Sequence, residues 1–329
     1  MMCGCRRCPC GPARRIADAI TVASPISAWQ GCARRLTKGG RRRVIAISDD
    51  TGSAGRRAGR HDMLELYHND QSSCSQKARL VLAEKGLDWE SHHLDLRAGD
   101  QQTPEYLKLN PKGVVPTLVD DGRAVRESNV IIEYVDNAYP GPAPLKPADA
   151  YGRAMVHLWT KRLDDGHHDI ATATLSMGIA FRHQYLSQGK EVADRLIENI
   201  PDPVKRERRR DIIYNGTEGR EFRLAVRLWE GLLTDMEAEL TGHGGDWIMG
   251  DDYTLVDLAY TPYLTRLDHL NALGFIADRP RLQAWYARVR ARPSYDTAIG
   301  KWDNADYVAL MREKGGEAWP RVKQIVAEL

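Results

Sequence analysis

Three hydroxyl groups and one thiol occupy four successive positions where a short apolar segment gives way to a helical pattern. Residues 72–75 read Ser-Ser-Cys-Ser, within the stretch LELYHNDQSSCSQKARLVLAEKGLDWE. Serine is favoured at the start of a helix, because its side-chain oxygen accepts hydrogen bonds from free backbone N–H groups. Those N–H groups and the positive end of the helix dipole also stabilise an anion such as a thiolate. The pattern therefore allows two functions, helix capping and activation of a sulfur nucleophile.

The elements that position this turn follow from the apolar periodicity. The segment MLELYH alternates and predicts a strand with Leu64 and Leu66 facing inward. Residues 73–85 show the apolar stripe of a helix, and DWESHHLDL predicts a second strand. A strand, a helix and a strand in succession imply a parallel pair with a right-handed crossover.

The remaining segments predict two domains. TPEYLKLNP predicts a short helix, VVPTLVDDGRAVRES a hairpin, and SNVIIEYVDNAYP a further helix. The order βαβαββα describes a small mixed sheet with helices on it. The Pro-rich segment GPAPLKPAD follows, and the pattern predicts helices from about residue 149 onward. We therefore expect an α/β domain over 63–141 and an all-α domain over 149–329.

Residues 1–62 differ from the rest in composition. They hold 13 Lys and Arg against 4 Asp and Glu, a charge of +9, whereas the remainder carries −7. Their apolar periodicity is poor, and Met63 stands directly before the first strand, so we expect a disordered or non-native extension. Cys3, Cys5, Cys8 and Cys10 lack a second ligand pair at finger-like spacing, and we expect no metal. Cys74 alone remains outside this segment, which fits a reducing compartment and a cytoplasmic location.

Composition also argues against two classes of partner. The sequence has no apolar run of roughly 18 residues, so we expect no membrane span. The basic run KRERRR at 205–210 is interleaved with acidic residues and has no aromatic platform, so we expect a solvated helix face and no nucleic acid. The histidine pair in DDGHHD lies about 100° apart on a helix, which disfavours joint chelation of a metal.

Four motifs in order resemble those of the cytosolic glutathione transferase superfamily. They are SSCS at 72–75, NPKGVVPTL at 110–118, ESNVIIEYV at 127–135 and GDDYTLVDLAYTPYL at 250–264. The last contains a capping box, which we interpret as structural. The resemblance implies a thioredoxin-like domain joined to an all-α helical domain, glutathione as cofactor, a hydrophobic aromatic substrate and a homodimer.

The resemblance also implies roles for single residues. Val115, before a cis proline at Pro116, would offer its backbone to the cysteinyl part of glutathione. Glu127 and Ser128 would hold the γ-glutamyl end, and Lys112 would face the glycyl carboxylate. These roles suit the chemistry, because a carboxylate pairs with an ammonium and a helix N-terminus accepts a carboxylate.

The SSCS turn resembles the site of serine-type transferases, in which a hydroxyl donates to the glutathione sulfur. By its spacing from the strand, Ser72 matches the catalytic serine, with Ser73 and Ser75 as capping or ligand-supporting candidates. The motif is also similar to that of zeta-class maleylacetoacetate isomerases, which implies that Cys74 is a helper thiol. A hydrogen bond from the hydroxyl would favour the thiolate, which is the nucleophile.

The second domain resembles the bacterial lignin β-aryl etherases of the fungal-like class. The shared features are an early Trp-Thr-Lys, the segment NIPDP before the basic run, and a long C-terminal tail. Those etherases carry glycine at the position of Ser72, and their serine aligns with Ser75, so the choice between the two serines stays open. We expect a glutathione transferase with β-etherase-like activity, with a zeta-type isomerase or a non-catalytic glutathione-binding module as alternatives.

The interpretation of residues 1–62 is testable by truncation. A chain that begins at Met63 should fold and retain glutathione-dependent activity, because the first predicted strand starts there. Circular dichroism and activity of the full and shortened chains check this expectation. A shortened chain that is unfolded or inactive would show that the segment packs on the body.

Overall fold

The computed structural model describes residues 63–141 and 144–329, and all of them belong to one compact unit. The expected extension over 1–62 lies outside the described residues. The first part contains β1 Leu64–His68, α1 Ser73–Glu84, β2 Trp89–His93, η1 Asp100–Gln102, α2 Pro104–Leu109, β3 Thr117–Asp120, β4 Arg123–Arg126 and α3 Ser128–Ala138. Apart from the short turn η1, this is the predicted order βαβαββα.

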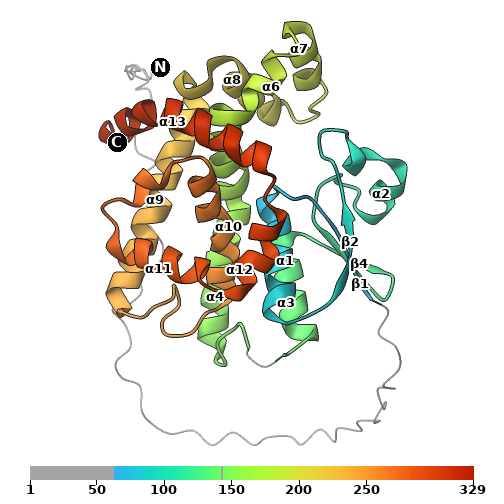
Figure 1. Ribbon diagram of the computed structural model, residues 1–329, viewed down its shortest axis with the longest axis vertical. Helices are drawn as coiled ribbons and strands as arrows, with labels where there is room; N and C mark the ends of the chain where they lie inside the picture. The colour runs from blue at the N-terminus through green and yellow to red at the C-terminus, as the bar shows by residue number, and fades with distance from the viewer. Residues whose placement is uncertain (1–62, 142–143) are drawn as a thin grey trace, which may run out of the picture. The chain divides into compact units, whose positions relative to one another are not determined.

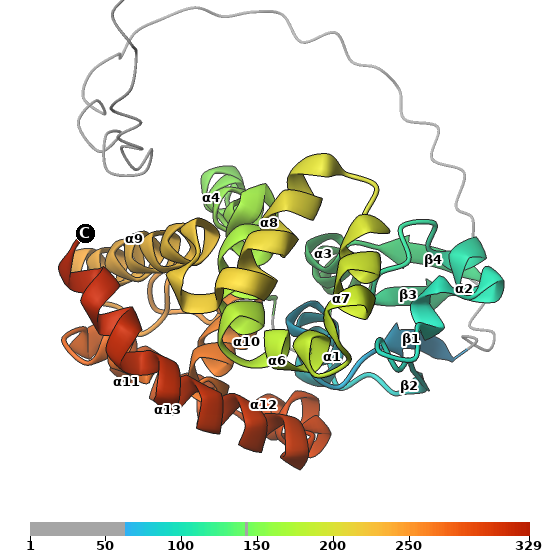
Figure 2. The ribbon, with the colours of Figure 1, turned by 90° about the horizontal axis from the view of Figure 1, so that it is seen from above.

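The strands form one mixed sheet in the order β2-β1-β3-β4. β1 runs parallel to β2, as predicted, and β3 runs antiparallel to both β1 and β4. Leu64 and Leu66 on β1 are buried, which confirms the predicted alternation. Figures 1 and 2 show α1 and α3 between the sheet and the helical part, with α2 on the opposite side of the sheet.

The second part is helical, as predicted. Its elements are α4 Ala150–Arg162, η2 Leu163–Thr172, α5 Ala173–Ser176, η3 Met177–Phe181, α6 Arg182–Leu186, α7 Lys190–Glu198, α8 Pro203–Asn215, η4 Gly216–Glu218, α9 Arg220–His243, α10 Leu255–His269, η5 Leu273–Ile276, α11 Pro280–Arg290, α12 Pro293–Ala298, η6 Gly300–Trp302 and α13 Ala305–Ala327. The stretch from α4 to α6 is helical apart from a kink at Gly166, and η2 and η3 are its π-helical segments. Within 144–329, β-type pairing is limited to a bridge between Trp247 and Gly250.

The buried carboxylate of Asp257 anchors α10. Its Oδ2 accepts from the backbone N–H of Thr254 at 2.9 Å, which closes the predicted capping box. Its Oδ1 accepts from the N–H of Ile248 at 2.9 Å and from the indole N–H of Trp285 at 2.8 Å. The Thr254 hydroxyl is a fourth donor, at 3.1 Å from Oδ2. A buried carboxylate with four donors is stable only when all of them stay in place, which supports the structural interpretation of this motif.

Helix α1 joins the two parts of the compact unit, because it packs on α3 on one side and on α10 and α12 on the other. At its C-terminal end, Glu84 accepts two hydrogen bonds from the guanidinium of Arg292, at 2.8 and 2.7 Å, and one from Ser294. The N-terminal turn of α1 is therefore held at a fixed position between the sheet and the helical part.

Helix α13 lies close to the end of α10 at one glycine. Gly315 is buried, and a Cβ atom there would overlap the carbonyl oxygen of Leu270. Gly316, the next residue, is exposed, and a Cβ atom there would have Asn271 Nδ2 as its nearest neighbour at 3.5 Å. The two glycines thus share a helix and differ in the space beside them.

Replacement of these glycines should have opposite effects. Gly315→Ala should lower the free energy of unfolding by about 1–3 kcal/mol, because α13 must move away from α10. Gly316→Ala should raise it by up to about 1 kcal/mol, because alanine is the better helix former. Chemical denaturation of both variants checks this, and equal effects would contradict the close approach.

Candidate active site

Ser72 is the N-cap residue of helix α1. Its backbone is extended, and its Oγ accepts from the N–H of Ser75 at 3.3 Å. A hydroxyl oxygen that accepts in this way can still donate its own proton to a ligand. Ser72 is half-buried, so a ligand can reach it.

Ser75 lies on the inner side of the same turn. Its side chain is fully buried, and its Oγ accepts from the backbone N–H of Asn69 at 3.2 Å. Ser73, the first residue of α1, is also buried. The geometry therefore favours Ser72 over Ser75 as the donor to a sulfur, and gives Ser75 a supporting contact within the loop.

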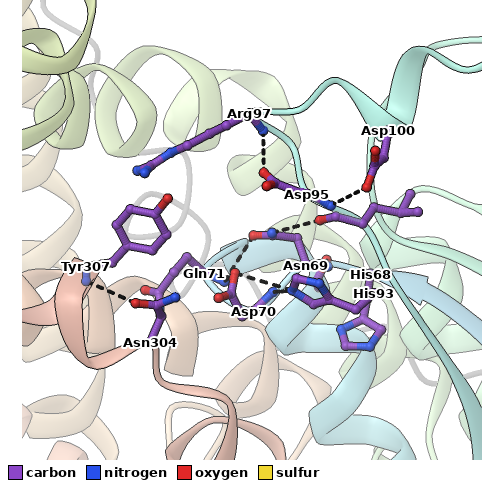
Figure 3. Close-up of polar contacts among 12 residues, drawn as sticks. His68, Asn69, Asp70, Gln71, His93, Asp95, Arg97, Asp100, Asn304 and Tyr307 are labelled. Carbon is purple, nitrogen blue, oxygen red and sulfur yellow. Dashed lines mark hydrogen bonds and ion pairs between the residues drawn. The ribbon is translucent and has the colours of Figure 1, made fainter. Parts of the chain in front are cut away.

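The loop between β1 and α1 is fixed by hydrogen bonds on several sides (Figure 3). Asn69 donates from Nδ2 to the carbonyl of Leu94 at 3.0 Å and accepts from the N–H of Gln71 at 3.0 Å. Arg266 of α10 donates to the carbonyl of Gln71 from the helical part. Ser72 is therefore presented by a loop with little freedom to move.

The Val115–Pro116 peptide bond is cis, as the resemblance implied. The preceding carbonyl, that of Val114, accepts from the hydroxyl of Tyr106 at 2.6 Å and from Nδ2 of Asn110 at 2.8 Å. These contacts hold the turn before β3.

Glu127 and Lys112 form an ion pair at the surface. The Lys112 Nζ to Glu127 Oε1 distance is 2.7 Å, and the hydrogen bond to Glu127 raises the pKa of Lys112. Glu127 adopts φ of 65°, unusual for a residue with a side chain, at the position that precedes α3. The two residues expected at opposite ends of glutathione thus lie within reach of each other.

Cys74 links the first turns of α1 and α3 to the helical part. The Ser128 side chain, at the first residue of α3, lies close enough to lower the pKa of this thiol. Sγ of Cys74 lies 3.5 Å from Nε2 of His168 on η2. Tyr263 of α10 also contacts this ring, with its hydroxyl 3.3 Å from Nδ1. The structure therefore brings the SSCS turn close to the start of ESNVIIEYV.

Sequence reasoning missed His168, Lys77 and Tyr263 as neighbours of the thiol. The histidine pair was considered only as a metal site, and the described part of the chain has no group of three or more His, Cys, Asp or Glu suited to a metal. Lys77 is fully buried, with Nζ donating to Asn129 Oδ1 at 2.9 Å. The sequence signal that indicates such a neighbour is the histidine pair directly after Gly166, within a segment of helical pattern.

Comparison with known proteins identifies the family. Residues 71–138 match the model of the glutathione S-transferase N-terminal domain, and residues 207–288 match that of the C-terminal domain. Glutathione S-transferase Z2 of Arabidopsis thaliana is 30% identical over 240 residues, which cover 72% of this chain and 90% of the relative. The chain belongs to the glutathione S-transferase family. Glutathione, the expected cofactor, is the cofactor of this family.

Two further relatives of this transferase are a β-etherase and a transferase whose structure contains glutathione. Protein LigF of Sphingobium sp. strain SYK-6 is 29% identical over 265 residues, covering 76% of this chain and 98% of LigF. The crystal structure of that protein, a β-etherase, superposes with a TM-score of 0.63 at 27% identity, covering 73% of this chain and 99% of LigF. A glutathione transferase of Burkholderia graminis, with two glutathione molecules bound per subunit, has a TM-score of 0.54 at 25% identity over 72% of this chain and 87% of its own.

No helix in the described part of this transferase is both long and apolar enough to cross a membrane.

Replacement of each serine should change a different property, the thiol pKa for Ser72 and the free energy of unfolding for Ser75. Ser72→Ala should raise the pKa of the bound glutathione thiol by about one to two units, because a hydrogen bond to a charged group is worth about 1.5–3 kcal/mol. Ser75→Ala should leave that pKa unchanged and lower the free energy of unfolding by about 1–3 kcal/mol, because the Asn69 N–H loses its acceptor. Thiolate absorbance, taken as the difference with and without glutathione, and denaturation check both. A pKa that moves only in Ser75→Ala would reverse the assignment.

Proposed function

We propose that this transferase binds glutathione along Val115, Glu127 and Ser128 and activates its thiol through Ser72. The observation that carries the proposal is the position of Ser72 at the first turn of α1, beside the first turn of α3. Lys77 of α1 donates to Asn129 at the start of α3 at 2.9 Å, so the two helix starts and their free N–H groups lie close together. A thiolate at the start of α1 and a carboxylate at the start of α3 suit this arrangement.

The residues beside the loop support an aromatic acceptor. The Arg97 guanidinium lies 3.6 Å from the ring centroid of Tyr307 and 5.9 Å from that of Phe181 (Figure 3 shows Arg97 and Tyr307). Gln71 is buried, and neither atom of its amide has a partner among the described residues. Aromatic faces accept an aromatic ring, and an amide suits a polar substituent on it.

The reaction proposed is displacement at the carbon β to an aryl ketone. The glutathione thiolate forms a C–S bond, the C–O bond of the aryl ether breaks, and the phenolate leaves with the electron pair. A phenol has a pKa near 10, so phenolate is a usable leaving group. The similarity to LigF along nearly its whole length supports this acceptor class.

A zeta-type isomerase is the second candidate. The SSCS turn and the similarity to glutathione S-transferase Z2 favour it. There glutathione would add to the substrate and leave again, without net conjugation. A protein that binds glutathione without turnover is the third candidate, since a fold does not fix an activity.

A homodimer in the cytoplasm is part of the proposal. Val130 on α3 and Tyr151 and Leu158 on α4 are exposed large apolar side chains. Glu133 on α3 and His157 on α4 lie 3.6 Å apart, so these two helices are neighbours. Exposed apolar residues on adjacent helices are typical of a surface that another subunit covers.

Product analysis tests the proposal. With glutathione and a β-aryl ether ketone, the wild-type chain should release phenol and form the glutathione thioether in equal amounts. Ser72→Ala should reduce kcat/KM by about tenfold or more at neutral pH, because the thiolate fraction falls. Turnover of maleylacetoacetate without phenol release would favour the isomerase, and glutathione binding without either activity would favour the binding module.

A further inference from the structure

The π-helical segment η2 carries two histidines into the interior. Gly166 within it has φ of 134°, which glycine adopts more readily than other residues. His167 is buried in the helical part, with its ring 4.7 Å from that of Trp229. His168 is half-buried and points to the start of α1. Segments of π-helix occur often at functional sites.

The His168 ring contacts a thiol and a hydroxyl. Cys74 Sγ is 3.5 Å from Nε2, within the range of a hydrogen bond to sulfur, and the Tyr263 hydroxyl is 3.3 Å from Nδ1. A protonated imidazole donates from both ring nitrogens. Cys74 Sγ is also 3.8 Å from Nδ1, so the sulfur lies against the side of the ring that both nitrogens share, close to the positive charge of an imidazolium. A thiol and an imidazole in contact, with a hydroxyl on the same ring, are the components of an activated nucleophile.

The surrounding charges favour the thiolate. Burial on its own would raise the pKa of Cys74, but His168, Lys77 and Ser128 together lower it to about 7. Burial and the charge of Lys77 act to lower the pKa of His168. Cys74 and Asp169 act to raise it, and the net result is a raised pKa. Burial and the nearby Cys74 raise the pKa of Tyr263 well above its usual value, so this hydroxyl stays neutral.

The acidic groups nearby have cationic or polar partners of their own. Asp169 lies 3.1 Å from Nζ of Lys205, and Asp164 accepts from Nδ2 of Asn129 at 2.9 Å. Lys77 also lies 5.0 Å from the ring centroid of Tyr263. The sulfur therefore faces two cationic side chains and one helix N-terminus, while the carboxylates of η2 are engaged elsewhere.

We propose that Cys74 and His168 form a thiolate–imidazolium pair and that Cys74 is a second nucleophile of this site, alkylated by soft carbon electrophiles without glutathione. Cys74 is half-buried, so a small reagent reaches it. In the reaction a C–S bond forms on Cys74, the leaving group departs with its electron pair, and His168 keeps its proton. The inference extends the helper role expected for Cys74, and it does not depend on the β-etherase proposal.

The experiment is the pH dependence of alkylation by iodoacetamide in the full chain, without glutathione. Mass spectrometry of the peptide that contains Cys74 separates it from the five cysteines of residues 1–62. Wild type should reach half its maximal rate near pH 7. In His168→Gln the midpoint should move toward the ordinary thiol value of about 8.5. At pH 6 the alkylation rate of His168→Gln should be roughly fivefold below that of wild type. The thiolate fraction is about thirtyfold lower in the variant, but its more basic thiolate is several times more nucleophilic.

Three further variants complete the test. Tyr263→Phe keeps the ring and removes the oxygen on Nδ1, so it should shift the midpoint in the same direction by less. His183→Gln makes the matched change at an exposed histidine of α6 and should leave the midpoint unchanged. Cys74→Ser should abolish the modified peptide. A wild-type midpoint at pH 8.5 or above, or one that neither His168→Gln nor Tyr263→Phe moves, would overturn the proposal.

Discussion

The buried guanidinium of Arg79 holds the loop on which the whole site depends. It donates to the carbonyls of Asn69 at 2.9 Å, Asp70 at 3.0 Å and Ala298 at 2.6 Å. The first two carbonyls belong to the β1–α1 loop, and the third ends α12 in the helical part. An arginine offers five N–H donors in a rigid plane, so one side chain fixes two segments far apart in the sequence. Without it the buried carbonyl of Ala298 would lose a donor that solvent does not replace, and the loop that presents Ser72 would lose two of its hydrogen bonds.

The site joins contributions from two kinds of structure. The sheet and its helices supply the backbone turn at Val115 and the starts of α1 and α3, which suit a peptide with charged ends. The helical part supplies side chains that approach α1 from the other direction, among them His168 and Tyr263. The thioredoxin-like part thus provides the general features of a thiol site, and the helical part adjusts the charge around it.

Sequence periodicity was sufficient for most of the fold. Alternation at Leu64 and Leu66 located β1, and the Thr254–Asp257 box located the start of α10, because both patterns are local. The burial of Lys77 and Arg79 was not foreseeable in the same way. Charged residues on a helix normally predict a solvent face, and here that face packs against α10 and α12. The π-helical segments were missed for a similar reason, since tertiary packing rather than a local pattern decides them.

The ion pair between Lys112 and Glu127 leaves the start of α3 and the turn before β3 without net charge at this point. The two side chains neutralise each other across 2.7 Å at an exposed position. An exposed pair of this kind is weak, so a ligand separates it at little cost. While they remain paired, these two residues present no net charge to nucleotides, inorganic phosphate or other passing anions. Under the proposed binding of glutathione, its ammonium and its carboxylate would replace these two side chains as each other's partners, whereas a simple anion would pair with Lys112 alone and leave Glu127 without a partner.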